Sequence, residues 1–322
     1  MGSPVSYKKI FIVGCPRSGT SWLQQMLASH KNVLPVENES HIYRLAYEPF
    51  TYVSGLNAKK RWQRWSYFLR HFGLPALLFG ATSSDIWNSI LRSHQIYQKN
   101  NDVGLHHLIS FQELKSLISE VSQRSGADLD KAQLLIHLIL DSFFEKAGGQ
   151  PQQIFLEKTP FHIKYADVIL KSFPEAKIIN MVRDGRDVCA SLRARSKAKQ
   201  WARYDTQTII SQWKKCIHLS EKFILDPALK DRIYSVKYEA LRQETLPQLG
   251  SVCDFIGLPT TPAELSQIID SYNIEKVKNK GVGQHVNKGS INSWKHVLPQ
   301  EHIELWHQSA GETLRRLGYA ST

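Results

Sequence analysis

The chain has 322 residues, of which 42% are hydrophobic and 10% aromatic, and this content excludes a wholly disordered protein. Its formal net charge of +12 favours an anionic partner, such as a nucleotide, a nucleic acid or an acidic membrane surface. Four scattered cysteines fit neither a zinc cluster nor a disulfide framework, so we expect reduced thiols in a cytoplasmic protein. We expect no signal peptide, because the N-terminal MGSPVSYKK has no apolar region before the first predicted strand. We expect no membrane span, because the longest apolar run, Leu134–Leu140, is interrupted by His137.

The first predicted element is a buried parallel strand, KKIFIVG (8–14), because the run is apolar and β-branched and ends in glycine. The loop GCPRSGTS (14–21) joins it to a helix. Its two glycines and last serine match the P-loop template G-x-x-x-x-G-K-[ST], but Thr20 stands in the lysine position and Arg17 supplies the cation. Without that lysine, and with no evident second acidic metal ligand, transfer of phosphate from Mg·ATP is disfavoured. The loop instead favours a metal-free site for one phosphate that carries a transferable group.

Residues 42–150 are predicted to be a mostly helical insertion that shapes an acceptor pocket within a single domain, 1–322. Apolar residues recur at helical intervals in WQRWSYFLRHF (62–72) and LLIHLILDSFFEKAGG (134–149), with few strand signals between them. The aromatic residues of 62–72 suggest an apolar lining.

The α/β pattern resumes in three segments, each an apolar strand followed by a helix: 153–160, 176–184 and 232–241. A glycine-rich basic loop is predicted over 278–290 and a last helix over 299–317. Strands that alternate with helices predict an α/β fold: a P-loop-type, doubly wound parallel sheet with helices on both faces.

Three cations follow predicted strands: Arg17, Lys158 and Arg183. The carboxyl ends of parallel strands gather at one edge of a doubly wound sheet, so these side chains are expected to meet at one cleft. In RDGRDVCAS, Ser191 lies eight residues after Arg183, which lets the two side chains grip one phosphate.

Five segments together resemble the PAPS-dependent sulfotransferases, which use 3′-phosphoadenosine 5′-phosphosulfate (PAPS) and release 3′-phosphoadenosine 5′-phosphate (PAP). The segments are PRSGTSWL (16–23), RDGRDVCAS (183–191), VKYEAL (236–241), DFIGLP (254–259) and NKGSINSWK (287–295). The first resembles the family's 5′-phosphosulfate loop and the second its 3′-phosphate motif. The resemblance implies PAPS as co-substrate and no metal.

The resemblance also implies the roles of individual residues. Those that hold the 5′-phosphosulfate are Arg17, Ser18, Gly19, Thr20 and Ser21. Trp22 either stacks on the adenine or is a core residue of its helix. Those at the 3′-phosphate are Arg183, Ser191 and the nearby Tyr238, and those that close over the nucleotide are Lys288 and Gly289. Arg17 and Lys158 are also expected to stabilise charge on the leaving phosphate.

The general base is where branches of the family differ. Cytosolic sulfotransferases use the histidine of a lysine-threonine-histidine run, but Pro160 stands in that position here. The tyrosylprotein and bacterial branches use a glutamate about twenty residues after the loop arginine, which matches Glu39 of ENESH. We therefore predict Glu39 as the base. The alternatives that stay open are Glu37, His41, His162 and the pair His106–His107.

The sequence thus predicts metal-independent transfer of a sulfuryl group from PAPS to a hydroxyl or amine. The acceptor is expected to be a small molecule or a group on a carrier, with no nucleic acid as partner. One alternative is a degenerate P-loop kinase, and a less favoured one is a basic nucleic-acid-binding protein. The acceptor's identity and the oligomeric state stay open.

Overall fold

The computed structural model describes residues 7–53, 82–100, 103–196, 204–272 and 290–319. By the density of their contacts, residues fall into two compact units. The helical unit comprises Met1–Tyr7 and Val36–Phe155, and the sheet unit comprises Lys8–Pro35 and Leu156–Thr322. The predicted insertion, 42–150, falls inside the helical unit. That the whole chain is one domain stays a prediction.

The sheet has five strands in the order β2-β3-β1-β4-β5. Their bounds are β1 Lys8–Gly14, β2 Val33–Pro35, β3 Ile154–Lys158, β4 Lys177–Val182 and β5 Ile233–Lys237. The pairs β1–β4 and β4–β5 are parallel, with Ile12 opposite Ile179 and Met181 opposite Val236. The α/β fold with a parallel sheet is confirmed, and the first strand has the predicted bounds. The three-residue β2 was not predicted.

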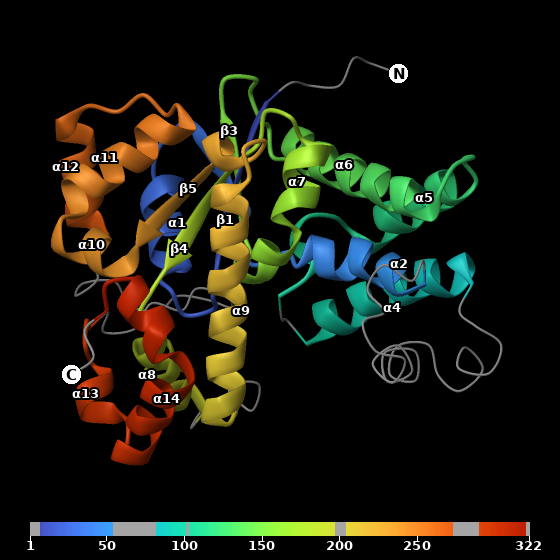
Figure 1. Ribbon diagram of the computed structural model, residues 1–322. Coiled ribbons are helices and arrows are strands. Elements are labelled where there is room, and N and C mark those ends of the chain that lie inside the picture. The colour runs from blue at the N-terminus through green and yellow to red at the C-terminus, as the bar shows by residue number, and fades with distance from the viewer. Residues whose placement is uncertain (1–6, 54–81, 101–102, 197–203, 273–289, 320–322) are drawn as a thin grey trace. The chain divides into compact units, whose positions relative to one another are not determined.

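Helices cover both faces of the sheet. Those of the sheet unit are α1 (Thr20–Ala28), α7 (Ala166–Ser172), α8 (Gly185–Ser196), α9 (Thr206–Leu225), α10 (Tyr238–Gln243), α11 (Thr245–Ile256), α12 (Pro262–Ser271), α13 (Trp294–Val297) and α14 (Gln300–Arg316), with the 3-10 segments η3 (Pro160–Tyr165) and η5 (Lys230–Arg232). In Figure 1, α9 passes in front of the sheet and α1 lies behind it. Between them β1 is fully buried over 11–13, as a strand covered on both faces must be.

Among the helices that were not predicted, α9 and α12 each begin at a side-chain cap. Asp205 accepts a hydrogen bond from the Thr208 amide (2.8 Å) at the start of α9. Thr261 and Glu264 form a capping box at the start of α12. The α9 helix buries Trp213, whose ring meets that of Trp306 from α14 edge to face at 5.4 Å. This contact joins α14 to the layer that α9 forms over the sheet.

The described residues of the helical unit form helices and turns, with strand only at the start of β3. Its elements are the π-helical turn η1 (Tyr43–Tyr47), α2 (Glu48–Val53), α4 (Ser83–Lys99), η2 (Leu105–His107), α5 (Phe111–Ser122) and α6 (Asp128–Lys146). Capping boxes at Thr82 and Ser110 start α4 and α5. The predicted helix over 62–72 lies outside the described residues. Of the helices described here and in the sheet unit, none is long and apolar enough to cross a membrane.

Candidate active site

The loop after β1 is a sharply folded backbone turn. Gly14, Arg17 and Gly19 all have left-handed backbone angles, with φ of 145°, 75° and 91°. A Cβ on Gly14 would lie 2.3 Å from the Met181 carbonyl oxygen of β4, and one on Gly19 would lie 2.4 Å from the Tyr238 ring. Both glycines are therefore required, because the loop is pressed against β4 on one side and α10 on the other.

The loop leads directly into α1, whose first residues, Thr20 and Ser21, are both buried. The first amides of a helix lack intrahelical acceptors and attract anions. Ser18, two residues before Thr20, is fully buried, and its hydroxyl has no hydrogen-bond partner among the described residues. A buried donor beside a helix N-terminus fits a phosphate or sulfate oxygen.

The segment after β4 is joined to this loop through Arg183. Its Nη1 donates to the carbonyl oxygen of Arg17 (2.9 Å), and its Nη2 donates to that of Ser290 (3.1 Å). The guanidinium lies 4.2 Å from the centre of the Tyr238 ring. The Arg17 side chain in turn donates from Nε to the Ser191 hydroxyl (3.1 Å). The structure thus brings together residues predicted for both ends of the nucleotide.

Arg183 keeps one donor for a ligand. The residue is 7% exposed, and its Nε has no hydrogen-bond partner in the part of the chain that the structure describes. Each of the two predicted phosphate sites therefore contains a buried, unsatisfied donor: Ser18 at the first and Arg183 at the second. This donor set fits PAPS, which carries an anionic group at each end of its ribose.

Two acids near Arg183, the buried Asp184 and the half-buried Glu239, both have hydrogen-bond partners. Arg186 binds the Asp184 carboxylate through Nε (3.0 Å) and Nη2 (2.7 Å). Glu239 accepts hydrogen bonds from the Asp184 amide (3.0 Å) and the Tyr319 hydroxyl (3.1 Å). Burial raises the pKa of the Glu239 carboxyl, more than the hydrogen bond from Asp184 and the charge of Arg183 lower it.

Lys158 ends β3 and is fully buried. The adjoining Glu157 is also fully buried; it accepts from the Thr159 hydroxyl (2.6 Å), and its Oε2 lies 3.0 Å from Nδ1 of His162. Since β3, β1 and β4 are neighbours in the sheet, the three predicted cations follow three adjacent strands. His162, one alternative base, has one ring nitrogen committed to the Glu157 carboxylate.

Glu39 belongs to the helical unit, where it pairs with a histidine. Its Oε2 lies 3.4 Å from Nε2 of His41, and the two side chains are 19% and 8% exposed. His41 has a left-handed φ of 50°, which is strained for a residue with a Cβ. The Glu39 carbonyl oxygen accepts from the Gly104 amide (2.9 Å). His106 and His107, two further alternatives, follow that glycine. The role of Glu39 as base stays a prediction.

Trp22 is 3% exposed, and its indole nitrogen donates to the Tyr272 carbonyl oxygen (2.9 Å). Its ring also meets that of Tyr238 edge to face at 6.2 Å. Trp22 thus contacts one core residue, Tyr238, and the half-buried Tyr272, and its stacking on adenine stays a prediction. Lys288 and Gly289 lie outside the described residues.

Sequence reasoning missed two acids of this site, the buried Asp187 and the half-buried Glu239. Asp187 accepts hydrogen bonds from residues 292–294, and Glu239 holds the Asp184 amide. Asp187 lies in RDGRDVCAS and Glu239 lies in VKYEAL, two segments that resemble the family's motifs. Their position was the signal that could have revealed them: a carboxylate inside a motif that binds anions needs a hydrogen-bonding partner of its own.

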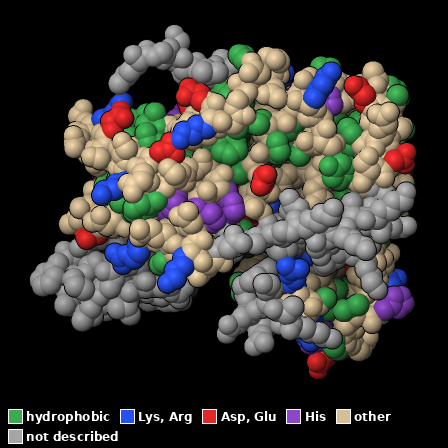
Figure 2. All heavy atoms as spheres, turned by 180° about the vertical axis from the view of Figure 1, so that it is seen from behind, with side chains coloured by type: hydrophobic (Ala, Val, Ile, Leu, Met, Phe, Trp, Pro, Cys, Tyr) green, Lys and Arg blue, Asp and Glu red, His purple; other side chains and the backbone are tan. Residues whose placement is uncertain are grey.

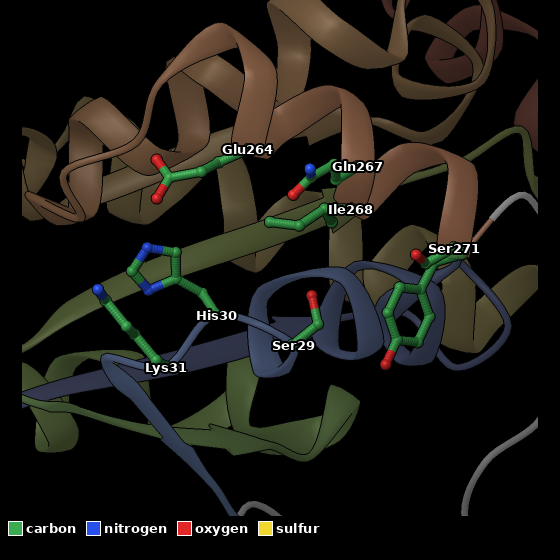
Figure 3. A pocket seen from close by; sticks show the side chains of 8 residues that line it. Ser29, His30, Lys31, Glu264, Gln267, Ile268 and Ser271 are labelled. Carbon is green, nitrogen blue, oxygen red and sulfur yellow. The ribbon is translucent and has the colours of Figure 1, made fainter.

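A cavity of about 290 Å³ lies at the other end of α1 (Figure 3). It is lined by residues 29–31 and by one side of α12, and Lys31 and His30 face Glu264 across it. A nine-residue helix is about 13 Å long, so this cavity is separate from the loop after β1. It contains none of the predicted site residues.

Positive charge is not concentrated on the face in Figure 2, where Lys and Arg side chains are spread among acidic and apolar ones. A protein that binds nucleic acid gathers its cations into a patch or stripe. Among the described residues, no group of three or more His, Cys, Asp or Glu is arranged to hold a metal ion.

Comparison with known proteins identifies the family. A profile described as the Sulfotransferase family matches residues 9–262. Protein-tyrosine sulfotransferase A of Caenorhabditis elegans is 23% identical over 317 residues, covering 96% of this chain and 67% of that protein. Protein-tyrosine sulfotransferase 1 of Danio rerio is 22% identical over 333 residues, covering 99% and 75%.

Among solved structures, sulfotransferase STF9 from Mycobacterium avium aligns with a TM-score of 0.53 and 12% sequence identity, covering 99% of this chain and 78% of that one. This similarity supports the fold. The family profile covers most of the chain, including both phosphate motifs, and it decides against the kinase and nucleic-acid alternatives. The chain belongs to the sulfotransferase family and is an enzyme that transfers a sulfuryl group from PAPS.

Proposed function

We propose that the loop after β1 binds the 5′-phosphosulfate of PAPS and that Arg183 and Ser191 bind its 3′-phosphate. The observation that carries this proposal is the direct link between the two motifs. Arg183 donates to the Arg17 carbonyl oxygen, and Arg17 donates to the Ser191 hydroxyl. The buried donors of Ser18 and Arg183 supply one anion contact at each end.

When bound, PAPS supplies a sulfuryl group, whose bond to the phosphate oxygen breaks as its bond to the acceptor atom forms. The chain's own task is to align the reactants and to stabilise the charge that develops on the departing phosphate. Arg17, Lys158 and the loop amides supply that stabilisation. The burial of Lys158 supports its role, since a cation held away from water acts more strongly on a nearby anion.

We further propose Glu39 as the general base that takes the proton from the acceptor hydroxyl or amine. Its carboxylate is partly buried beside His41 on a strained backbone, and strained backbones gather at functional sites. His41 can hold the Glu39 carboxylate in one orientation, as a second residue often does for a base. In contrast, the Nδ1 contact of His162 with Glu157 supports a structural role for that histidine.

The variant Glu39→Gln tests the base. Glutamine keeps the size of the side chain but accepts no proton, so kcat should fall roughly 10²–10⁴-fold while PAP affinity stays unchanged. The matched control is Glu301→Gln, at a carboxylate that is 79% exposed on α14. Near wild-type kcat in Glu39→Gln, together with loss of activity in His41→Ala, would assign the base to the histidine instead.

Binding is tested by thermal shift. PAP should raise the melting temperature of the protein without Mg²⁺, and neither ATP nor DNA should match that shift. A shift that requires Mg²⁺ and is larger with ATP would contradict the proposed nucleotide site.

The acceptor and the location of the protein are the finer parts of the proposal. We propose a small-molecule or carrier-bound hydroxyl, and two relatives named for protein tyrosine favour phenolic hydroxyls as the first candidates. An acceptor screen with PAPS, read by mass spectrometry, tests this. The four free, buried cysteines support a cytoplasmic location, which fractionation of tagged cells would check.

A further inference from the structure

The short segment 290–294 is fastened to the first turn of α8 by one carboxylate. Asp187 is 1% exposed. It accepts from the Asn292 amide (2.9 Å), the Ser293 hydroxyl (2.8 Å) and the Trp294 amide (3.0 Å). Three hydrogen bonds to an ionised acceptor are individually stronger than neutral ones. A carboxylate this deeply buried is stable only because all three are made.

A backbone turn and a ring contact also fix the same segment. Asn292 has a left-handed φ of 60°, a turn that asparagine tolerates better than most residues. The guanidinium of Arg186, itself held by Asp184, lies 3.9 Å from the centre of the Trp294 ring, which is 3% exposed. The position of 290–294 against α8 is therefore determined by its backbone, a carboxylate and a stacked cation.

This segment in turn holds Arg183. The carbonyl oxygen of Ser290 accepts from Nη2, and that of Arg17 accepts from Nη1. A planar guanidinium fixed at both ends cannot rotate, so the direction of its remaining Nε donor is set by the positions of the two carbonyls. Ser290 lies two residues before Asn292, so loss of the Asp187 contacts frees one of the two carbonyls.

We propose that Asp187 is a positioning residue that aims Arg183 and so makes the enzyme prefer nucleotides with a 3′-phosphate over those without one. The inference rests on the proposed function, in which Arg183 binds that phosphate. Asp187 acts through 290–294 and does not touch the phosphate, whose negative charge it would repel. Its effect should therefore appear in selectivity at the 3′ position and not in general nucleotide binding.

The experiment compares PAP with AMP, which lacks the 3′-phosphate, by calorimetry on the full-length chain. In Asp187→Asn, the amide group would place a donor against a donor at one of the three hydrogen bonds. We expect PAP affinity to fall roughly tenfold or more while AMP affinity is unchanged, so that the PAP-to-AMP ratio falls. Ser293→Ala removes one bond and keeps the buried carboxylate; it should lower the ratio by a smaller factor and serves if Asp187→Asn does not fold.

Asp205→Asn is the matched control, because Asp205 also accepts from one amide and one hydroxyl, both of Thr208, but at the start of α9. It should leave the ratio at the wild-type value. An unchanged ratio in the Asp187 and Ser293 variants, or equal losses for PAP and AMP, would overturn the inference. A wild-type protein that binds PAP no better than AMP would instead refute the 3′-phosphate assignment of Arg183, and the inference with it.

Discussion

The two segments of the sheet unit that we propose bind the phosphates of PAPS are built in different ways. The loop after β1 is defined by backbone shape: left-handed residues and two glycines, Gly14 and Gly19, without space for a Cβ. The segment after β4 is defined by buried charges, each with a named partner, such as Asp184 with Arg186. Substitutions that add atoms should therefore disrupt the loop after β1, and substitutions that remove charge should disrupt the segment after β4.

The largest expected effect is on stability, from Gly14→Ala. The added Cβ would lie 2.3 Å from the Met181 carbonyl oxygen of β4, on a backbone with a φ of 145°. Strain and overlap together should cost roughly 3–5 kcal/mol of unfolding free energy, measured by urea denaturation.

The control for this variant is Gly126→Ala, which has a φ of 117° but nothing within 4 Å of the added Cβ. It isolates the cost of backbone conformation, about 1–2 kcal/mol. Equal losses in the two variants would show that the contact with β4 is not what requires glycine.

Removal of charge from the second segment should act on binding. Arg183→Ala is expected to weaken PAP binding by about 1.5–3 kcal/mol, with a smaller loss in Ser191→Ala, measured by calorimetry. Arg316→Ala is the control, because this arginine makes a two-pronged pair with Glu221 on the surface of α14. Unchanged PAP affinity in Arg183→Ala would contradict the proposal that Arg183 binds the 3′-phosphate.

A smaller, pH-dependent effect is expected at Glu239. Because burial raises its folded-state pKa, the folded protein holds this proton where the unfolded chain, with an ordinary value of 4.5, has lost it. Its contribution to stability is thus present below pH 4.5 and is lost as the pH rises through the folded pKa.

Glutamine can keep both hydrogen bonds of Glu239, since the Tyr319 hydroxyl can also accept. The melting temperature of Glu239→Gln should therefore rise relative to that of the wild type as the pH increases from 4.5 to 8. If the difference between the two melting temperatures stays constant across that range, Glu239 has the same pKa in the folded and unfolded protein, which would contradict the prediction.

The smallest expected effect is that of a chelator. The loop after β1 has Thr20 in place of the lysine of ATP-using loops, so EDTA should leave turnover of the purified enzyme nearly intact. A strict requirement for Mg²⁺ in the chemical step would mean that the charge on the departing phosphate is not stabilised by Arg17 and Lys158.

The sequence predicted those features that depend on local pattern. The β1 strand and its loop were found because an apolar run ends in spaced glycines, and Arg183 because it follows the next such run. The three-residue β2 carries a weak local signal. The α9 helix has a clear one, an N-cap at Asp205 and apolar residues at helical spacing, which sequence reasoning missed. The partners of Asp187 are more than a hundred residues away, so no local pattern could reveal them. Glu239 and Tyr319 are 80 residues apart, so their contact is also invisible to local pattern.

The hydrogen bonds of Arg183 have a consequence for how the enzyme folds. They join segments that lie 166 and 107 residues away along the chain, so the guanidinium finds its acceptors only after most of the sheet unit has assembled. Contacts of such long range form slowly, because much chain entropy is lost before they contribute. Recovery of PAP binding during refolding should therefore lag behind recovery of helical circular dichroism, which makes the nucleotide a probe of the last folding step.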